Sequence, residues 1–139
     1  MQKKSYAKIP FLPASHENKT YPGVLKKILF THKDFLENGH VRMINWAFLP
    51  IGSSFTAHYH EDMEEVFIIT TGKVKLCVEN KQFILKSGDS ILIPAKSVHQ
   101  MINFGQKDVN YIVIGISKKE HLKPWKEHIS GQEFVLNNV

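Results

Sequence analysis

At 139 residues, with 42% apolar and 22% charged side chains, the chain has the composition of a globular protein with one hydrophobic core. No apolar run reaches the ~20 residues that span a membrane, no apolar secretory segment follows the basic N-terminus, and Cys77 is the only cysteine. We therefore expect a cytoplasmic protein without an internal disulfide. The net charge of +5 is spread over lysines in ones and twos, which predicts a basic surface and no nucleic-acid partner.

Three segments are predicted along the chain. Residues 1–23 are polar and interrupted by three prolines, which indicates an irregular N-terminal arm. Residues 24–118 alternate short β-rich runs with turn signals, the pattern of a barrel or sandwich. The candidate strands are residues 24–30, 41–49, 55–59, 65–70, 73–79, 82–85, 90–93, 99–104 and 110–117. Residues 119–139 form a C-terminal extension that we expect to pack on the barrel, with residues 119–128 as a short helix limited by Pro124.

The candidate strand at residues 24–30 exposes backbone groups that need covering. Pairing of this edge with a second copy of the chain predicts a homodimer, in which the N-terminal arm crosses to the partner.

Two histidines, His58 and His60, stand two residues apart in a candidate strand. Side chains of a strand alternate faces, so both imidazoles point the same way, ~6.6 Å apart along the backbone. A carboxylate from the next strand, Glu65, and a third imidazole, His99, complete a set of three nitrogens and one oxygen. This set suits one divalent first-row transition metal: Zn, Fe, Mn, Ni or Co. Glu64 competes with Glu65 for this role, and strand alternation lets only one of them face inward.

The motif residues resemble the cupin superfamily. The first cupin motif, G-x5-H-x-H-x4-E-x6-G, is matched by Gly52, His58, His60, Glu65 and Gly72. The second, G-x5-P-x-G-x2-H-x3-N, is matched by Gly88, Pro94, His99 and Asn103. Lys96 stands where the family has its remaining glycine. The resemblance implies an all-β fold, the cupin double-stranded β-helix or jelly-roll barrel, as a small single domain with the metal inside.

Two outcomes are open at position 96, where lysine replaces the glycine of the motif. If the family's glycine slot requires a positive φ, a lysine there costs on the order of 1 kcal/mol, and the loop either bears this cost or takes a different turn. The ammonium group of Lys96 is then either solvated or directed toward an anionic substrate.

Four ligands on a six-coordinate ion leave about two positions for water or substrate, which is a catalytic layout. The resemblance implies a metalloenzyme acting on a small oxygenated substrate such as a sugar or a hydroxy or keto acid, by isomerase, lyase or dioxygenase chemistry. The alternative is a non-catalytic cupin that binds or senses a small metabolite. Candidate substrate contacts face the barrel interior: Arg42, Phe67, Met101 and Tyr111.

Some assignments stay open in the sequence. The parity of the strand at residues 41–49 is not fixed, so only one of Arg42 and Asn45 faces inward. An inward Arg42 would clamp a carboxylate or phosphate with its guanidinium group. The histidines His16, His32 and His40 show no ligand spacing, and no catalytic residue beyond the metal site is predicted.

Overall fold

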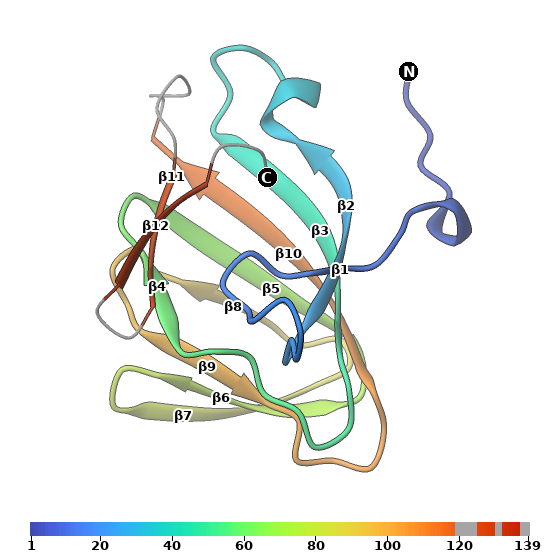
Figure 1. Ribbon diagram of the computed structural model, residues 1–139, viewed down its shortest axis with the longest axis vertical. Coiled ribbons are helices and arrows are strands. Elements are labelled where there is room, and N and C mark those ends of the chain that lie inside the picture. The colour runs from blue at the N-terminus through green and yellow to red at the C-terminus, as the bar shows by residue number, and fades with distance from the viewer. Residues whose placement is uncertain (119–124, 130–131, 137–139) are drawn as a thin grey trace.

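Two six-stranded antiparallel sheets pack face to face in the computed structural model (Figure 1), which describes residues 1–118 and the backbone of 125–129 and 132–136. The first sheet has the order β1 (Leu12–Pro13), β2 (Leu25–Thr31), β3 (Val41–Leu49), β10 (Val109–Ser117), β5 (Met63–Thr71) and β8 (Ser90–Ile93). The second has the order β12 (Gln132–Leu136), β11 (Trp125–Ile129), β4 (His58–His60), β9 (His99–Ile102), β6 (Lys73–Val78) and β7 (Lys81–Lys86). This arrangement confirms the predicted all-β jelly roll.

Helical structure in the described residues consists of two single 3-10 turns, η1 (Tyr6–Lys8) and η2 (His32–Asp34). Neither is of a length that crosses a membrane, and no described helix is apolar and long enough to do so.

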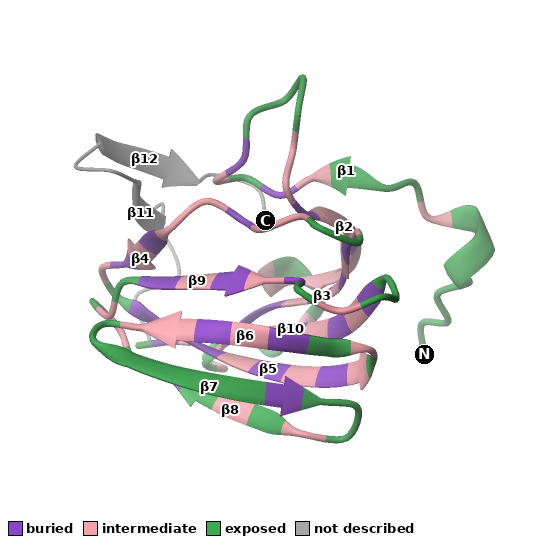
Figure 2. Cartoon of the chain, turned by 90° about the horizontal axis from the view of Figure 1, so that it is seen from below, coloured by how far each residue is buried: buried purple, intermediate pink, exposed green. Residues whose placement is uncertain are grey.

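Alternating burial along the long strands builds the core between the sheets. Buried and partly exposed positions alternate through the whole of β10 and most of β5, as Figure 2 shows by colour. Many of the inward side chains, among them Phe67, Ile69, Val109, Tyr111 and Val113, are branched or aromatic, which favours the pleated strand conformation. The apolar residues that are at most 1% exposed are Leu49, Phe55, Ile69, Val74, Leu76, Ile93, Met101 and Val109.

The strand boundaries follow the predicted ones closely where turn residues mark them. Residues 41–49 and 90–93 form β3 and β8 as predicted. The candidate strand at 55–59 is shorter, since β4 contains only His58–His60.

The predicted helix at residues 119–128 is wrong where the structure describes it. Trp125–Ile129 form β11, which pairs with β4, and residues 119–124 lie outside the described residues. The edge of β4 offers unpaired backbone groups, and a strand satisfies them where a helix would not.

The N-terminal arm packs on the barrel of its own chain, and its crossing to a partner stays a prediction. Strand β1 pairs with the start of β2, matching Leu12 with Lys26 and Pro13 with Leu25. The Lys27 ammonium group donates to the Tyr6 carbonyl at 2.6 Å and lies 3.4 Å from the centroid of the Tyr6 ring. The edge of β2 is therefore partly covered within one chain, and the homodimer stays a prediction.

Lys96 adopts the left-handed conformation that the family's glycine would take, with φ +66°. The loop keeps its turn, because the Lys96 N–H donates to the His60 carbonyl at 2.7 Å. The side chain is exposed, and its ammonium group lies 3.9 Å from a Glu61 carboxylate oxygen. An exposed pair at this distance contributes little to stability.

We expect Lys96→Gly to raise the free energy of unfolding by about 0.5–1 kcal/mol, because glycine removes the Cβ strain at positive φ and only part of this gain is lost to backbone entropy. Lys96→Ala is the control, since it removes the charge and keeps the Cβ. Urea denaturation followed by tryptophan fluorescence measures both. An equal gain in the alanine variant would show that the charge, and not the backbone, is responsible.

Candidate metal centre

Four predicted ligands meet between the two sheets. His58 and His60 project from β4 and His99 from β9 in one sheet, and Glu65 projects from β5 in the other. All four are buried, and one candidate ligand atom from each lies within 4.8 Å of the other three. These side chains are therefore positioned to hold a metal ion. Glu64 is only partly buried on the opposite face of β5, so Glu65 is the carboxylate of this cluster.

Backbone carbonyl groups orient two of the imidazoles. His58 Nδ1 lies 2.6 Å from the Thr56 carbonyl oxygen, and His99 Nδ1 lies 2.8 Å from the Ser97 carbonyl oxygen. A carbonyl oxygen only accepts, so each Nδ1 carries the proton and donates it. In a neutral ring this leaves Nε2 with a lone pair, which is the form that binds a metal.

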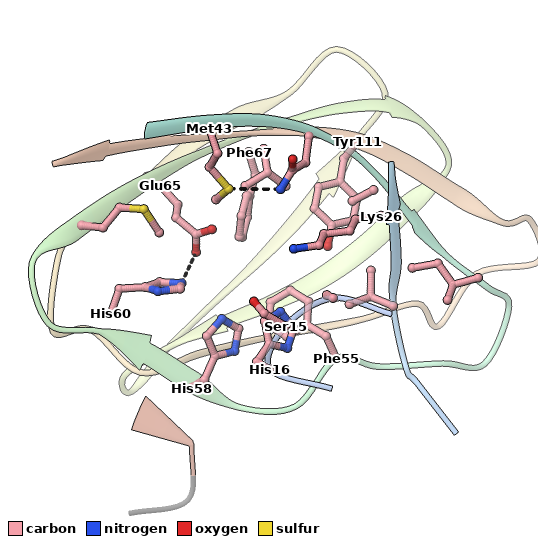
Figure 3. Close-up of a pocket in the computed structure, with 17 residues that line it drawn as sticks. Ser15, His16, Lys26, Met43, Phe55, His58, His60, Glu65, Phe67 and Tyr111 are labelled. Atoms are coloured by element: carbon pink, nitrogen blue, oxygen red, sulfur yellow. Dashed lines mark hydrogen bonds and ion pairs between the residues drawn. The ribbon is translucent and has the colours of Figure 1, made fainter. Parts of the chain in front are cut away.

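One Glu65 carboxylate oxygen, Oε1, is shared by two of the rings. His60 Nε2 lies 2.9 Å from it and His99 Nε2 lies 3.1 Å from it (Figure 3 draws the first). Burial raises the pKa of Glu65, but the charge and hydrogen bond of His60 and the hydrogen bond of His99 outweigh it and hold that pKa well below its usual value. Glu65 is thus an ionised acceptor in the interior.

His99 provides a test of whether these residues fit a metal. Acceptors face both of its ring nitrogens, the Ser97 carbonyl at Nδ1 and the Glu65 carboxylate at Nε2. A neutral imidazole carries one proton and satisfies only one of them. A divalent cation between His99 Nε2 and Glu65 would replace the missing proton and leave the Ser97 hydrogen bond intact. The donor set therefore fits a metal ion.

Burial also keeps the His58 ring in its neutral form. Removal from water, followed by the charges of His16, His99 and His60, lowers the pKa of His58 well below its usual value. The ring is neutral at pH 7, so no proton has to leave before it coordinates a metal.

A pocket opens from this cluster toward β2 and β3 (Figure 3). Its enclosed volume is about 50 Å³, room for a few water molecules or a very small ligand. Phe55 and Phe67 form apolar walls, and Tyr111 lies beyond them. Burial, and then the charges of Glu65 and Glu17, raise the pKa of Tyr111 well above its usual value, so its hydroxyl group is a donor.

Two of the four candidate substrate contacts line the pocket, and two do not. Phe67 and Tyr111 line the pocket, whereas Met101 is packed in the core and Arg42 does not line it. In β3 the pocket-lining residues are Met43, Asn45 and Ala47. Arg42 lies at a β-bulge, because the pairing with β10 skips it between Val41 and Met43. Of the two open alternatives, Asn45 and not Arg42 lines the pocket.

Sequence reasoning missed two residues of the arm. His16 stacks on His58, with ring centroids 3.8 Å apart, and lines the pocket beside Ser15 (Figure 3). The Glu17 carboxylate fixes this segment, because it accepts from Gly23 N at 2.7 Å, from Thr56 N at 2.7 Å and from His16 Nδ1 at 2.8 Å. No spacing signal marks either residue, since both act through a fold of the arm that has no periodic pattern.

Comparison with known proteins identifies the family. The model of the cupin domain family matches residues 45–115, half of the chain, and includes all four residues of the cluster. The chain belongs to the cupin family.

The similar proteins confirm the fold over most of the chain. A predicted oxalate decarboxylase from Thermotoga maritima superposes with a TM-score of 0.72 at 22% identity, covering 84% of this chain and 99% of that one. A sugar phosphate isomerase of the cupin superfamily from Silicibacter pomeroyi has a TM-score of 0.68 at 18% identity, covering 98% and 92%. An uncharacterized protein of Methanocaldococcus jannaschii is 37% identical over 59 residues, 42% of this chain and about half, 47%, of that protein.

Proposed function

We propose that this protein is a metal-dependent cupin enzyme acting on a small oxygenated substrate, a sugar or a hydroxy or keto acid. His58, His60, Glu65 and His99 would hold one divalent transition metal ion: Zn, Fe, Mn, Ni or Co. The observation that carries the proposal is the buried cluster of three imidazoles and one ionised carboxylate that opens onto a pocket. A structural metal site would have no reason to open onto a pocket.

When bound, the ion would supply Lewis-acid polarisation of a substrate oxygen, or an oxygen-binding position in the case of iron. The chain's own residues provide the surroundings. Phe55 and Phe67 exclude water on two sides, and the Tyr111 hydroxyl group is a donor that stays protonated at pH 7. Such a setting favours isomerase or lyase-type chemistry over dioxygenation. The names of two proteins with the same fold, a decarboxylase and an isomerase, agree with that order.

The alternative, a cupin that binds or senses a metabolite without converting it, is favoured by one observation. The enclosed volume is small, about 50 Å³, and Ala14, Ser15 and His16 of the arm line it. A ligand held under such a cover would be retained rather than turned over.

Elemental analysis of protein purified without chelator or metal-affinity tag tests the proposal. We expect about one metal ion per chain in the wild type and none in His58→Ala/His99→Ala, with circular dichroism as the check on folding. Iron would direct the substrate screen to oxygen consumption, and zinc, manganese or nickel to isomerase, lyase and decarboxylase assays. If no divalent ion binds even after reconstitution, the proposal fails. A ligand that binds to the metal-loaded protein and is recovered unchanged would favour the sensor.

A further inference from the structure

The first sheet presents its inward side chains to the pocket in three successive rows. The row at the metal end joins Met43 of β3 to Glu65 of β5 through Gly115 of β10. The next joins Asn45 to Phe67 through Val113. Each row is two residues, ~7 Å, further along the strands than the one before.

The third row carries the polar groups at the far end. Lys26 of β2 and Tyr111 of β10 are the direct partners of Ala47, one on each side of it. Partners in an antiparallel pair point to the same face, and the short Ala47 side chain leaves the space between them open. Figure 3 shows the result, with the Lys26 ammonium group beside Tyr111 and across the pocket from His60. A cation and a phenol donor together at the end of an apolar pocket attract an anionic oxygen.

The middle row holds a buried acceptor. Asn45 is 4% exposed, and its Nδ2 donates to the Met43 sulfur at 3.0 Å. Its Oδ1 has no hydrogen-bond partner among the described residues. A buried acceptor without a donor costs stability, and a hydroxyl group on a bound ligand would supply that donor.

We propose that Lys26, Tyr111 and Asn45 form a subsite for a small hydroxy acid. Lys26 and Tyr111 donate to its carboxylate, Asn45 Oδ1 accepts from its hydroxyl group, and an oxygen at its other end faces the metal ligands. This last contact rests on the proposed function, whereas the first two do not.

Three matched probes test the subsite on metal-loaded protein by isothermal titration calorimetry. Glycerate has the carboxylate, the middle hydroxyl group and a terminal oxygen. Glyceramide lacks the charge, and 3-hydroxypropanoate lacks the middle hydroxyl group. We expect the wild type to bind glycerate most tightly of the three. Failure of metal-loaded wild type to bind glycerate at millimolar concentration, or equal binding of glyceramide, would overturn the proposal.

Variants assign the contacts. Lys26→Met should weaken glycerate binding at least about tenfold, leave glyceramide unchanged and retain the metal. Tyr111→Phe removes only the hydroxyl group. It tests the contact with the glycerate carboxylate a second time if Lys26→Met does not fold. Asn45→Leu should abolish the preference for glycerate over 3-hydroxypropanoate while raising the melting temperature. The exposed Lys86→Met is the matched control and should change nothing.

Failure of the proposed function and failure of the subsite are distinguishable. If the folded wild-type protein binds no metal, the proposed function is contradicted. The affinities of the metal-free protein for glycerate and glyceramide would then be compared to decide the subsite. If Lys26→Met and Tyr111→Phe bind glycerate as the wild type does, with the metal present, the subsite is wrong and the metal site stands.

Discussion

Glu65→Gln is expected to lower metal affinity by at least about 100-fold, since loss even of an outer partner costs 10–100-fold and Glu65 is proposed as a ligand itself. The amide carries no charge to balance a divalent ion in the interior. It also replaces one of the two acceptor oxygens with an NH2 group, which only donates and cannot bind a cation. Competition of the protein with a chromogenic chelator for zinc measures the change.

Glu64→Gln is the matched control for this experiment. It makes the same substitution one residue away, on the face of β5 that points out of the cluster, and should bind zinc as the wild type does. A large loss in Glu64→Gln, or wild-type affinity in Glu65→Gln, would show that the carboxylate ligand has been assigned to the wrong residue.

Glu17→Gln is expected to reduce the free energy of unfolding at pH 7 by up to about 3 kcal/mol. Burial raises the pKa of Glu17, but the hydrogen bonds and charge of His16 and the Thr56 N–H outweigh it and lower that pKa to about 2. A depressed carboxylate pKa adds stability above the unfolded value, near 4.5, and the contribution is lost as the pH falls toward 2. Glutamine removes the charge and should remove this pH dependence with it.

Urea denaturation from pH 7 to pH 3 measures the difference between the wild type and Glu17→Gln. The gap should be widest at neutral pH and should close as the solution becomes acidic. Glu37→Gln, at an exposed position, is the control and should track the wild type. A gap that stays constant with pH would mean that the carboxylate acts by shape and not by charge.

The parts of the fold that were predictable are those with a local pattern. Alternating side chains and flanking turns located β3 and β8 to the residue. Fixed spacing located His58, His60, Glu65 and His99, and the structure brings them together because β4 and β9 of one sheet and β5 of the other direct these side chains into the barrel.

The unpredicted parts depend on contacts between distant segments. The bulge at Arg42 arises from a shift in pairing with β10 and leaves no mark in the sequence of β3. His16 reaches His58 only because Glu17 binds backbone groups at Gly23 and Thr56, and no periodicity encodes such a loop. Trp125–Ile129 form a strand because they pair with the backbone of β4. A prediction from local sequence alone does not include this long-range pairing.

The four candidate metal ligands are divided between the two sheets, with Glu65 on one and the three histidines on the other. An ion bound among them would therefore be a cross-link between the halves of the barrel. Its binding free energy would resist their separation, so the thermal midpoint of the protein would rise with metal concentration by mass action. Chelators would then act on this protein as mild denaturants, and a melting curve would report whether its metal has been lost.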